Sequence, residues 1–289
     1  MNIVEGIIKR YISLKHKYTH KNTSHKYKGS LKVLQNEVSV INDKIPLGTS
    51  AWENNRRNIR KSILEFDDIS NFINWDVIQK TMFYEAPKVE YQEVIKNELL
   101  FRSIEESRIG NPKPYYLNQN SSGNLVHHAY SVSRLFNKCK LNYFSKIIEF
   151  GGGYGSMCRL FRNMNYSEEY IIFDLPEFLA LQKFYLKSVN KKYINNTVFI
   201  SDVNKLSNDN LNTLFIATWS LSEMPIDLRE KLLEYVTFDY CLIAFQSEFD
   251  GINNVKYFNG FKNRYNDIDF DIIPIGHLKG HFYLIGARK

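Results

Sequence analysis

A glycine-rich stretch near the middle of the chain carries the clearest chemical signal. The apolar run 146–150 contains an acidic residue, Glu149, and the glycines Gly151, Gly153 and Gly155 follow it directly. Glycine lets the chain turn sharply and lets a ligand approach the backbone where a side chain would block it. A helical sequence comes next, so the spacing predicts a strand, a tight turn and a helix that together hold a nucleotide-like ligand.

Two further carboxylates stand at the ends of apolar runs. Asp174 follows the run 170–173, and Asp202 comes shortly after the run 197–200. The two oxygens of a carboxylate can accept hydrogen bonds from both hydroxyls of a ribose. Acidic residues at three strand ends, of which Glu149 is the first, indicate a nucleotide-like ligand more specifically than the glycines alone. The alternative is that all three are solvated carboxylates without a ligand.

These residues need a sheet to bring them together. Short apolar runs alternate with amphipathic ones after residue 140, which predicts an α/β fold with parallel strands covered on both faces. The strands are expected at residues 146–150, 170–173, 197–200, 214–218 and 240–245. The runs 270–275 and 282–287 have no room for a crossover helix between them, so they are expected to form a C-terminal antiparallel hairpin.

The preceding part of the chain has a helical pattern. Ser50 is expected to cap a helix through Phe66, Ser70 a helix over 71–82, and Ser121 or Ser122 a helix ending near Cys139. Apolar residues over 89–106 also recur at helical spacing. The polar segments 111–114 and 118–123 are expected to form a loop that acts as a hinge or lid. We therefore divide the chain into a basic arm (1–35), a helical cap (36–140) and a cofactor-binding domain (141–289).

The third glycine distinguishes between cofactors. A dinucleotide fingerprint, G-x-G-x-x-G, would place its last glycine at position 156, where the chain has Ser156. The observed pattern over 149–155 resembles motif I of class I S-adenosylmethionine-dependent methyltransferases. The segments 148–155, 173–176, 219–225 and 281–286 together look like those of bacterial sugar O-methyltransferases encoded among surface-glycan genes. This resemblance covers about residues 115–289.

The resemblance implies a Rossmann-like methyltransferase sheet that binds S-adenosylmethionine and releases S-adenosylhomocysteine. It also implies a sugar hydroxyl as the acceptor, in the synthesis of a surface polysaccharide such as lipopolysaccharide O-antigen or capsule. Trp219 stands after the fourth strand as a cofactor wall or, alternatively, as a core aromatic residue. The cofactor-binding residues carried over in this way are Glu149, Gly151, Gly153, Gly155, Asp174, Leu175, Asp202, Val203 and Trp219.

Methyl transfer to oxygen also needs a base that removes the hydroxyl proton. The loop between the two hairpin strands returns to the carboxyl edge of the sheet, so His277 and His281 are candidates, and histidine titrates near neutrality. We favour His281, which begins a strand; a solvent-facing hairpin histidine is the alternative. Glu223 and Glu248 share that edge and are expected to bind sugar hydroxyls, orient the histidine, or serve as the base.

The cap contributes candidates for holding the acceptor. Tyr116 and His128 lie beside the polar loop, and aromatic faces with polar tips suit a pyranose ring. Packing within the cap is the alternative role for such residues. A hard cation would need several converging oxygen ligands, and the sequence has no compact carboxylate cluster, so we predict no metal.

Composition limits the function classes. The chain has 289 residues, 44% of them hydrophobic, and a net charge of +7. The first 35 residues carry eight lysines and arginines against Glu5 alone, so the rest is neutral, which disfavours a nucleic-acid enzyme. The basic arm is interpreted as a solvated segment or as a patch for anionic membrane or an acidic partner.

The sequence also bears on location and on rival functions. It has no apolar run of the roughly 18 to 20 residues that a membrane span needs and no secretory signal, and its three cysteines form no C-x-x-C pair. We expect a cytoplasmic enzyme, either free in the cytoplasm or bound at the inner face of the membrane. The rivals are a small-molecule or natural-product O-methyltransferase, an NAD-dependent oxidoreductase and a non-catalytic Rossmann-like scaffold. No pattern indicates the oligomeric state.

Overall fold

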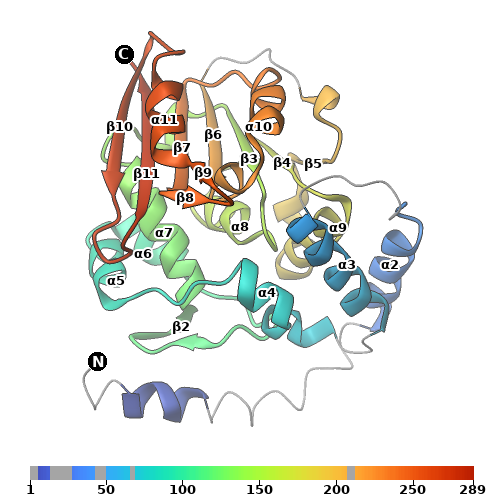
Figure 1. Ribbon diagram of the computed structural model, residues 1–289. Helices are drawn as coiled ribbons and strands as arrows, with labels where there is room; N and C mark the ends of the chain where they lie inside the picture. The colour runs from blue at the N-terminus through green and yellow to red at the C-terminus, as the bar shows by residue number, and fades with distance from the viewer. Residues whose placement is uncertain (1–5, 14–27, 43–49, 66–68, 207–211) are drawn as a thin grey trace.

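A seven-stranded sheet forms the centre of the protein in the computed structural model (Figure 1). Its strand order is β10-β11-β7-β6-β3-β4-β5; β3 to β7 run parallel, and β11 is antiparallel to both β7 and β10. The strands are β3 (Lys146–Phe150), β4 (Glu169–Phe173), β5 (Thr197–Ile200), β6 (Thr213–Thr218), β7 (Tyr240–Gln246), β10 (Ile268–Pro274) and β11 (His281–Arg288). The structure describes residues 6–13, 28–42, 50–65, 69–206 and 212–289.

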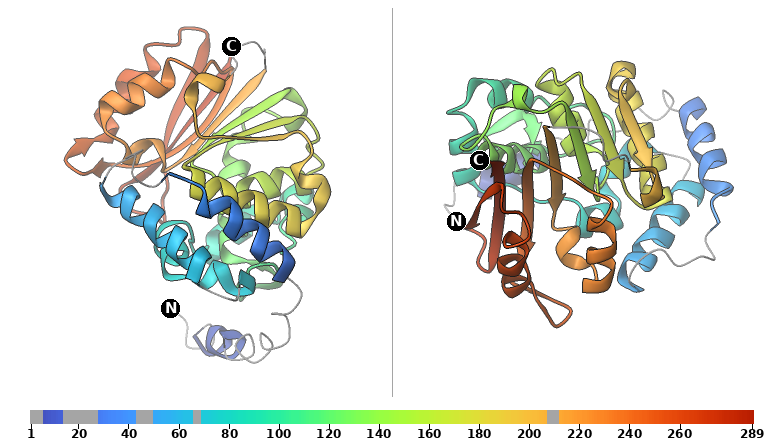
Figure 2. Two further views of the ribbon diagram at one scale, coloured as in Figure 1. Left: turned by 90° about the vertical axis from the view of Figure 1, so that its right-hand side faces the viewer. Right: turned by 90° about the horizontal axis from the view of Figure 1, so that it is seen from above.

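Helices cover both faces of the sheet, because successive residues of its buried strands point to opposite sides. Ile147 packs into a core with three helices, whereas Ile148 packs into a second core on the other face. Figure 2 shows the sheet between these layers. The first layer contains α7 (Gly123–Leu135), α8 (Ser156–Asn163) and α9 (Pro176–Val189), and the second contains α10 (Ile226–Leu233) and α11 (Asn254–Lys262). This is an α/β, Rossmann-like sheet with a C-terminal hairpin, as the sequence predicts.

The strand order determines where a ligand can bind. β3 has β4 on one side and β6 on the other, so the chain winds away from β3 in opposite directions. Ligands of open α/β sheets bind at the carboxyl ends of the strands at such a switch point. β10 runs parallel to β7, so the loop over residues 275–280 lies at the same edge, as the sequence predicts.

The N-terminal part forms a cap of short helices. Arg56 on α3 donates to Glu177 on α9 at 2.6 Å, and both side chains are buried. This ion pair joins the cap to a helix of the sheet layer. The cap elements are α2 (Lys28–Ser39), α3 (Ser50–Glu65), the 3₁₀ helix η3 (Ile69–Asn74), α4 (Asp76–Thr81), α5 (Lys88–Val94), α6 (Glu98–Ser103), β1 (Pro114–Tyr115) and β2 (Asn118–Ser122).

Two predicted helices of the cap are interrupted. The run 71–82 breaks at Trp75, whose extended backbone (φ −64°, ψ 141°) precedes α4. The run 89–106 breaks where the Asn97 side chain accepts the Leu100 N–H and starts α6. An extended residue at Trp75 and a side-chain cap at Asn97 therefore divide patterns whose apolar spacing continues across each break. Phe66, the predicted end of the first helix, and the side chain of its predicted cap, Ser50, lie outside the described residues.

At the end of the cap, the structure confirms the expected helix cap but not the expected loop. The Ser122 side chain accepts the Leu125 N–H at the start of α7, so Ser122 is the cap that the sequence offered as one of two choices. The expected loop over 118–123 instead contains β2, which pairs with β1. Backbone pairing has therefore ordered a segment whose polar composition is typical of a loop.

α7 connects the cap with the sheet. The Ser131 hydroxyl on α7 lies 2.9 Å from the Tyr283 hydroxyl on β11, and both side chains are buried. The predicted boundary between cap and cofactor-binding domain, at residue 140, assigns α7 to the cap, although this helix shares a core with the sheet. The boundary therefore stays a prediction. Of the described helices, none has both the length and the apolar character that crossing a bilayer requires.

Candidate active site

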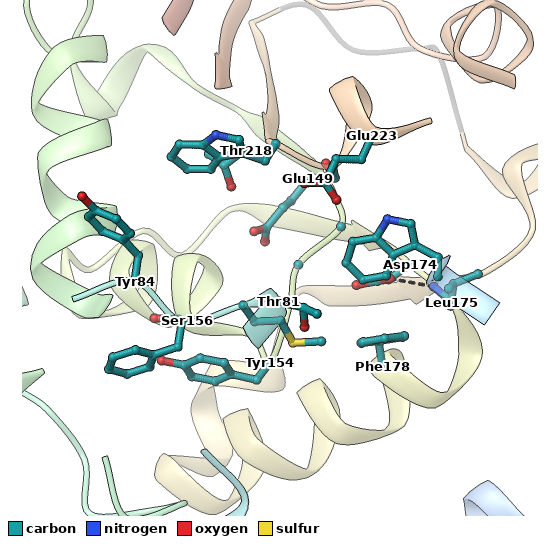
Figure 3. Close-up of a pocket in the computed structure, with 18 of the residues that line it drawn as sticks. Thr81, Tyr84, Glu149, Tyr154, Ser156, Asp174, Leu175, Phe178, Thr218 and Glu223 are labelled. Atoms are coloured by element: carbon teal, nitrogen blue, oxygen red, sulfur yellow. Dashed lines mark hydrogen bonds between the residues drawn. The ribbon is translucent and has the colours of Figure 1, made fainter. Parts of the chain in front are cut away.

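A cavity of about 410 Å³ opens where the parallel strands β3, β4 and β6 end. Its floor is the glycine turn after β3, and its remaining walls come from the strand ends, the cap and the hairpin. Figure 3 shows Glu149 between Tyr84 on one side and Asp174 on the other. Residues predicted from the sequence that line the cavity are Glu149, Gly151, Gly153, Asp174, Leu175, Trp219, Glu223, His128 and His281.

The glycine turn has a backbone that other residues would distort. Gly151 has φ +74°, and a Cβ atom built on it would overlap the Ser220 side chain. Gly153 has φ +58° and also lines the cavity, so the backbone itself forms part of the wall there. Gly155 precedes α8 with φ +97° and lies outside the lining. Two of the three predicted glycines thus face the ligand space.

Glu149 is a buried carboxyl group at the end of β3. The Tyr170 hydroxyl donates a hydrogen bond to it at 2.8 Å. Burial raises the pKa of Glu149 to about 8; the Tyr170 hydrogen bond lowers it and the nearby Asp174 carboxylate raises it. A buried acid with this pKa attracts a cationic ligand, because a positive charge favours its ionised form.

Asp174 lies at the end of β4, beside Glu149. Its oxygens accept the Leu175 N–H at 2.8 Å and the Gln182 side-chain amide at 2.7 Å. Burial raises the pKa of Asp174 to about 7, against the lowering effect of these donors. The donors hold the carboxyl group in one orientation at the cavity wall, where a ligand hydroxyl can reach it.

The third predicted strand-end acid lies elsewhere. Asp202 is exposed, and its side chain caps the following turn by accepting the Asn204 N–H at 3.1 Å. Neither Asp202 nor Val203 belongs to the cavity lining, whereas the preceding residue, Ser201, does. The structure therefore brings together two of the three acids and leaves Asp202 outside the cavity.

Trp219 forms the wall after β6. Its backbone has φ +64°, a conformation that bulky residues adopt at a cost. Its indole Nε1–H donates to His281 Nδ1 at 2.9 Å, and its ring stacks on His127 with centroids 5.3 Å apart. Contacts on both sides fix the ring at the cavity wall.

His281 begins β11, as predicted, and faces the cavity with one nitrogen engaged. An indole N–H is only a donor, so His281 Nδ1 must be the acceptor of the Trp219 bond. A neutral imidazole then carries its proton on Nε2. Burial and the nearby His127 lower the pKa of His281, which favours the neutral form of the ring. In this arrangement His281 offers a hydrogen-bond donor to a ligand, not a free lone pair.

Glu223 and Glu248, the two acids after β6 and β7, differ in their surroundings. Glu223 lines the cavity, and burial raises its pKa to about 7 while a hydrogen bond with the Trp52 side chain lowers it. Glu248 is exposed on β8 (Glu248–Phe249), which pairs with β9 (Ile252–Asn253), outside the lining. Glu223 is placed to meet a ligand, and Glu248 is not.

Of the three remaining predicted residues, one lines the cavity and two lie outside it. His128 lines the cavity; burial and the adjacent His127 lower its pKa to about 3. Tyr116 lies outside the lining and packs against Tyr115. His277 also lies outside it, and its Nε2 is 2.6 Å from the buried Glu90 carboxylate. Only His128 of these three can touch a ligand in the cavity.

Sequence reasoning missed the contribution of the cap to this cavity. Trp52 on α3 and the segment 82–84 after α4 line it, with no motif to indicate that they would. Phe178 could have been found, because it follows the Asp-Leu-Pro turn at 174–176 by less than one helical turn. His127, which also lines the cavity, lies next to the predicted His128 in sequence, but no motif singles it out. Within the described ranges, no group of three or more His, Cys, Asp and Glu side chains could hold a metal ion.

Comparison with known proteins gives a likeness in fold only. No protein-family model and no curated protein sequence matches the chain. Among solved structures, the glycopeptide N-methyltransferase MtfA in complex with S-adenosylmethionine is 8% identical and has a TM-score of 0.44, over 56% of this chain and 94% of that chain.

Two other structures are similar at the same level. An O-methyltransferase family protein from Burkholderia thailandensis is 13% identical over 57% of each chain, with a TM-score of 0.38. The 16S rRNA methylase ArmA is 15% identical over 55% of this chain and 80% of that chain, with a TM-score of 0.37. Likeness of this degree leaves the chemistry of the present chain to be argued from its own cavity.

Proposed function

We propose that this protein is an S-adenosylmethionine-dependent O-methyltransferase that acts on a sugar hydroxyl. One observation carries the proposal. Glu149 and Asp174, from the ends of neighbouring strands, line a single cavity together with the glycine turn at the switch point of the sheet. A cationic, ribose-containing ligand needs that combination of carboxylates and approachable backbone.

The cavity fits S-adenosylmethionine in charge and in an unsatisfied polar atom. Glu149, Asp174 and Glu223 supply three acidic groups for a ligand with a sulfonium and an ammonium group. Ser156 Oγ lies in the lining, is buried and has no hydrogen-bond partner within the described part of the chain. Buried polar atoms are rarely left so, and a ligand donor would satisfy this one. When bound, the cofactor supplies an electrophilic methyl group.

The acceptor proposal rests on the aromatic side of the cavity and on the family resemblance. Tyr84 and Trp219 present aromatic rings with polar edges, which suit the alternating apolar and hydroxyl surfaces of a pyranose, and His127 packs between them. His281 adds a hydrogen-bond donor beside them. We propose a nucleotide sugar or a growing surface glycan as the acceptor, with His128 and Glu223 as further contacts.

The proposed cellular setting is the cytoplasmic face of the membrane, where surface glycans are assembled. The basic arm supports it. In the described part of that arm, residues 6–13 are helical and expose Ile7, Ile8 and Tyr11 beside Lys9 and Arg10. Basic and apolar side chains on one short helix favour contact with anionic lipid.

Transfer of a radiolabelled methyl group tests the proposed function. Purified protein is incubated with [methyl-³H]S-adenosylmethionine and a panel of nucleotide sugars and methyl glycosides, with RNA as a control acceptor. We expect label in at least one sugar, none in RNA, and loss of transfer in Asp174→Ala.

Asp227→Ala, which removes an exposed acid from the first turn of α10, should behave as wild type. Labelled RNA with unlabelled sugars would contradict the sugar acceptor. Full activity of Asp174→Ala would contradict the assigned cofactor site.

A further inference from the structure

Two histidines from distant parts of the chain share one buried carboxylate. Glu90 on α5 is fully buried and accepts from His127 Nδ1 on α7 at 2.9 Å. It also accepts from His277 Nε2, in the loop between β10 and β11, at 2.6 Å. A buried carboxylate is costly unless its charge is compensated. A cluster of this kind joins the cap, α7 and the hairpin at the edge of the active-site cavity.

The cluster sets the proton positions on His127. When the Glu90 carboxylate accepts from Nδ1–H, the neutral imidazole of His127 has its lone pair on Nε2. That atom is buried and has no hydrogen-bond partner among the described residues. Buried polar atoms without a partner are uncommon and need an explanation. A ligand hydroxyl that donates to Nε2 would supply one.

His127 also lies where an acceptor would bind. It lines the cavity, its ring stacks on Trp219, and the Tyr84 ring lies 4.4 Å from its own. Trp219 comes directly after β6, beside the carboxylates that we assign to the cofactor. The imidazole therefore belongs to the aromatic wall on which the proposed sugar rests.

The other candidate bases are less suited to this role. His281 Nδ1 already accepts the Trp219 indole proton, so its second nitrogen carries a hydrogen. His277 lies outside the cavity lining and is hydrogen-bonded to Glu90. Among the histidines that the structure describes, only His127 combines a carboxylate on one nitrogen, an unpartnered second nitrogen and a place in the lining.

We infer that His127 is the general base of the methyl transfer, with Glu90 and His277 as positioning residues; the inference rests on the proposed function. The acceptor oxygen forms a bond to the methyl carbon as the bond from that carbon to sulfur breaks. Sulfur leaves as the thioether of S-adenosylhomocysteine, and the hydroxyl proton moves to His127 Nε2. The Glu90 carboxylate holds the ring and stabilises the imidazolium that forms.

NMR of protein labelled with ¹⁵N-histidine tests the proton positions without any acceptor. His127→Gln assigns the His127 signals. At pH 8 we expect a protonated Nδ1 and an unprotonated Nε2 in the wild type, and a mixture of tautomers in Glu90→Gln, whose amide can donate as well as accept. A wild-type His127 with its proton on Nε2 would overturn the inference, because that nitrogen could not accept the hydroxyl proton.

Kinetics with the sugar that shows the highest labelling test the role in transfer. His127→Gln should lower kcat by about 10²- to 10⁴-fold, the usual effect of losing a general base, with S-adenosylhomocysteine affinity unchanged. Glu90→Gln should lower kcat more than it raises the KM for the sugar. Ser133→Ala is the matched control: it removes a side-chain hydrogen bond on α7, to the Tyr130 carbonyl, that does not involve His127, and it should keep kcat within a few-fold.

The outcomes separate the two proposals. Failure of the wild type to bind S-adenosylhomocysteine or to label any sugar would overturn the proposed function and this inference with it. Normal cofactor binding with a nearly unchanged kcat in His127→Gln would overturn the inference alone. Loss of transfer in Glu223→Gln with His127→Gln still active would assign the base to Glu223 instead.

Discussion

Glu149 and Asp174 give the cavity a charge that depends on pH. Burial raises the pKa of Glu149 to about 8 and that of Asp174 to about 7. Each group is therefore partly neutral near pH 7 in the free protein. A cationic ligand binds better once these groups are ionised, so the proposed cofactor and the protons compete for the same site.

The first prediction concerns this competition. The affinity for S-adenosylmethionine should rise as pH increases from 6 to 8.5, by up to about tenfold per pH unit for each group below its pKa. Calorimetric titration across this range measures it. Glu149→Gln should flatten the dependence. A constant affinity in the wild type would contradict the role assigned to the carboxyl groups.

The stability of the ligand-free protein should fall as pH rises, whereas the affinity for the cofactor rises. Both pKa values are raised on folding, so both groups stabilise the folded state fully below their unfolded values, near pH 4. That contribution is lost as pH rises through the folded values of about 7 and 8. Thermal unfolding without ligand should therefore show the stabilisation from these groups declining between pH 5 and pH 8, and Glu149→Gln should remove part of the decline.

At the scale of elements, α3 depends on its contact with α9. Arg56 and Glu177 are both buried, and Arg56 also donates to the Asn42 carbonyl at 2.9 Å. The contact holds Trp52, one turn earlier on α3, at the cavity. Because a buried charge without its partner is costly, this pair is a sensitive point of the cap.

We predict that Arg56→Leu lowers the free energy of unfolding by about 3–5 kcal/mol, since it removes the closer of the two arginines that pair with the buried Glu177 carboxylate and leaves only Arg60, at 3.9 Å. Denaturant unfolding measures the change. The double variant with Glu177→Leu should recover a large part of the loss. A loss as large in the double variant as in the single one would show that the pairing of charges is not the cause.

The sequence predicted the sheet better than the cap. All seven expected strands agree with the structure to within two residues. The central parallel strands β3, β4, β6 and β7 are mostly buried and therefore read as short apolar runs. Helices of the cap break at Trp75, whose backbone is extended, and at Asn97, whose side chain caps the next helix, although the apolar pattern continues across both. A pattern of spacing does not encode such breaks.

The site residues that come directly after a strand could be predicted from the sequence. Glu149 and Asp174 could be placed because parallel strands end at the same edge. Asp202 follows the same rule and still turns outward to cap a local turn. His127 could not be singled out, because its partner Glu90 is 37 residues away in sequence, and His277, which bonds the same carboxylate, is 187 residues from Glu90; the three meet only in the folded chain.

At the scale of the whole molecule, charge is concentrated in the basic arm. Eight of the 38 lysines and arginines fall in the first 35 residues, against one acidic residue there. If the arm holds the enzyme at a membrane, each of its lysines near the lipid surface contributes roughly 1 kcal/mol. Catalysis would not depend on it, because the cavity is built from other parts of the chain.

We predict that replacing Lys15, Lys17 and Lys21 by glutamine weakens binding to vesicles containing phosphatidylserine by roughly 100-fold. Sedimentation with the vesicles measures binding. The control variant replaces three exposed lysines near the end of α9: Lys187, Lys191 and Lys192. Equal binding of the two variants would argue for a solvated arm.

The identity of the cofactor is the central claim, and calorimetry tests it most directly. The purified protein is titrated with S-adenosylmethionine, S-adenosylhomocysteine and NAD at pH 8. We expect the first two to bind, NAD not to bind, and Asp174→Ala to lose about 10- to 100-fold in affinity through the missing charge-assisted hydrogen bonds. Binding of NAD alone, or no binding of S-adenosylmethionine, would contradict the methyltransferase account.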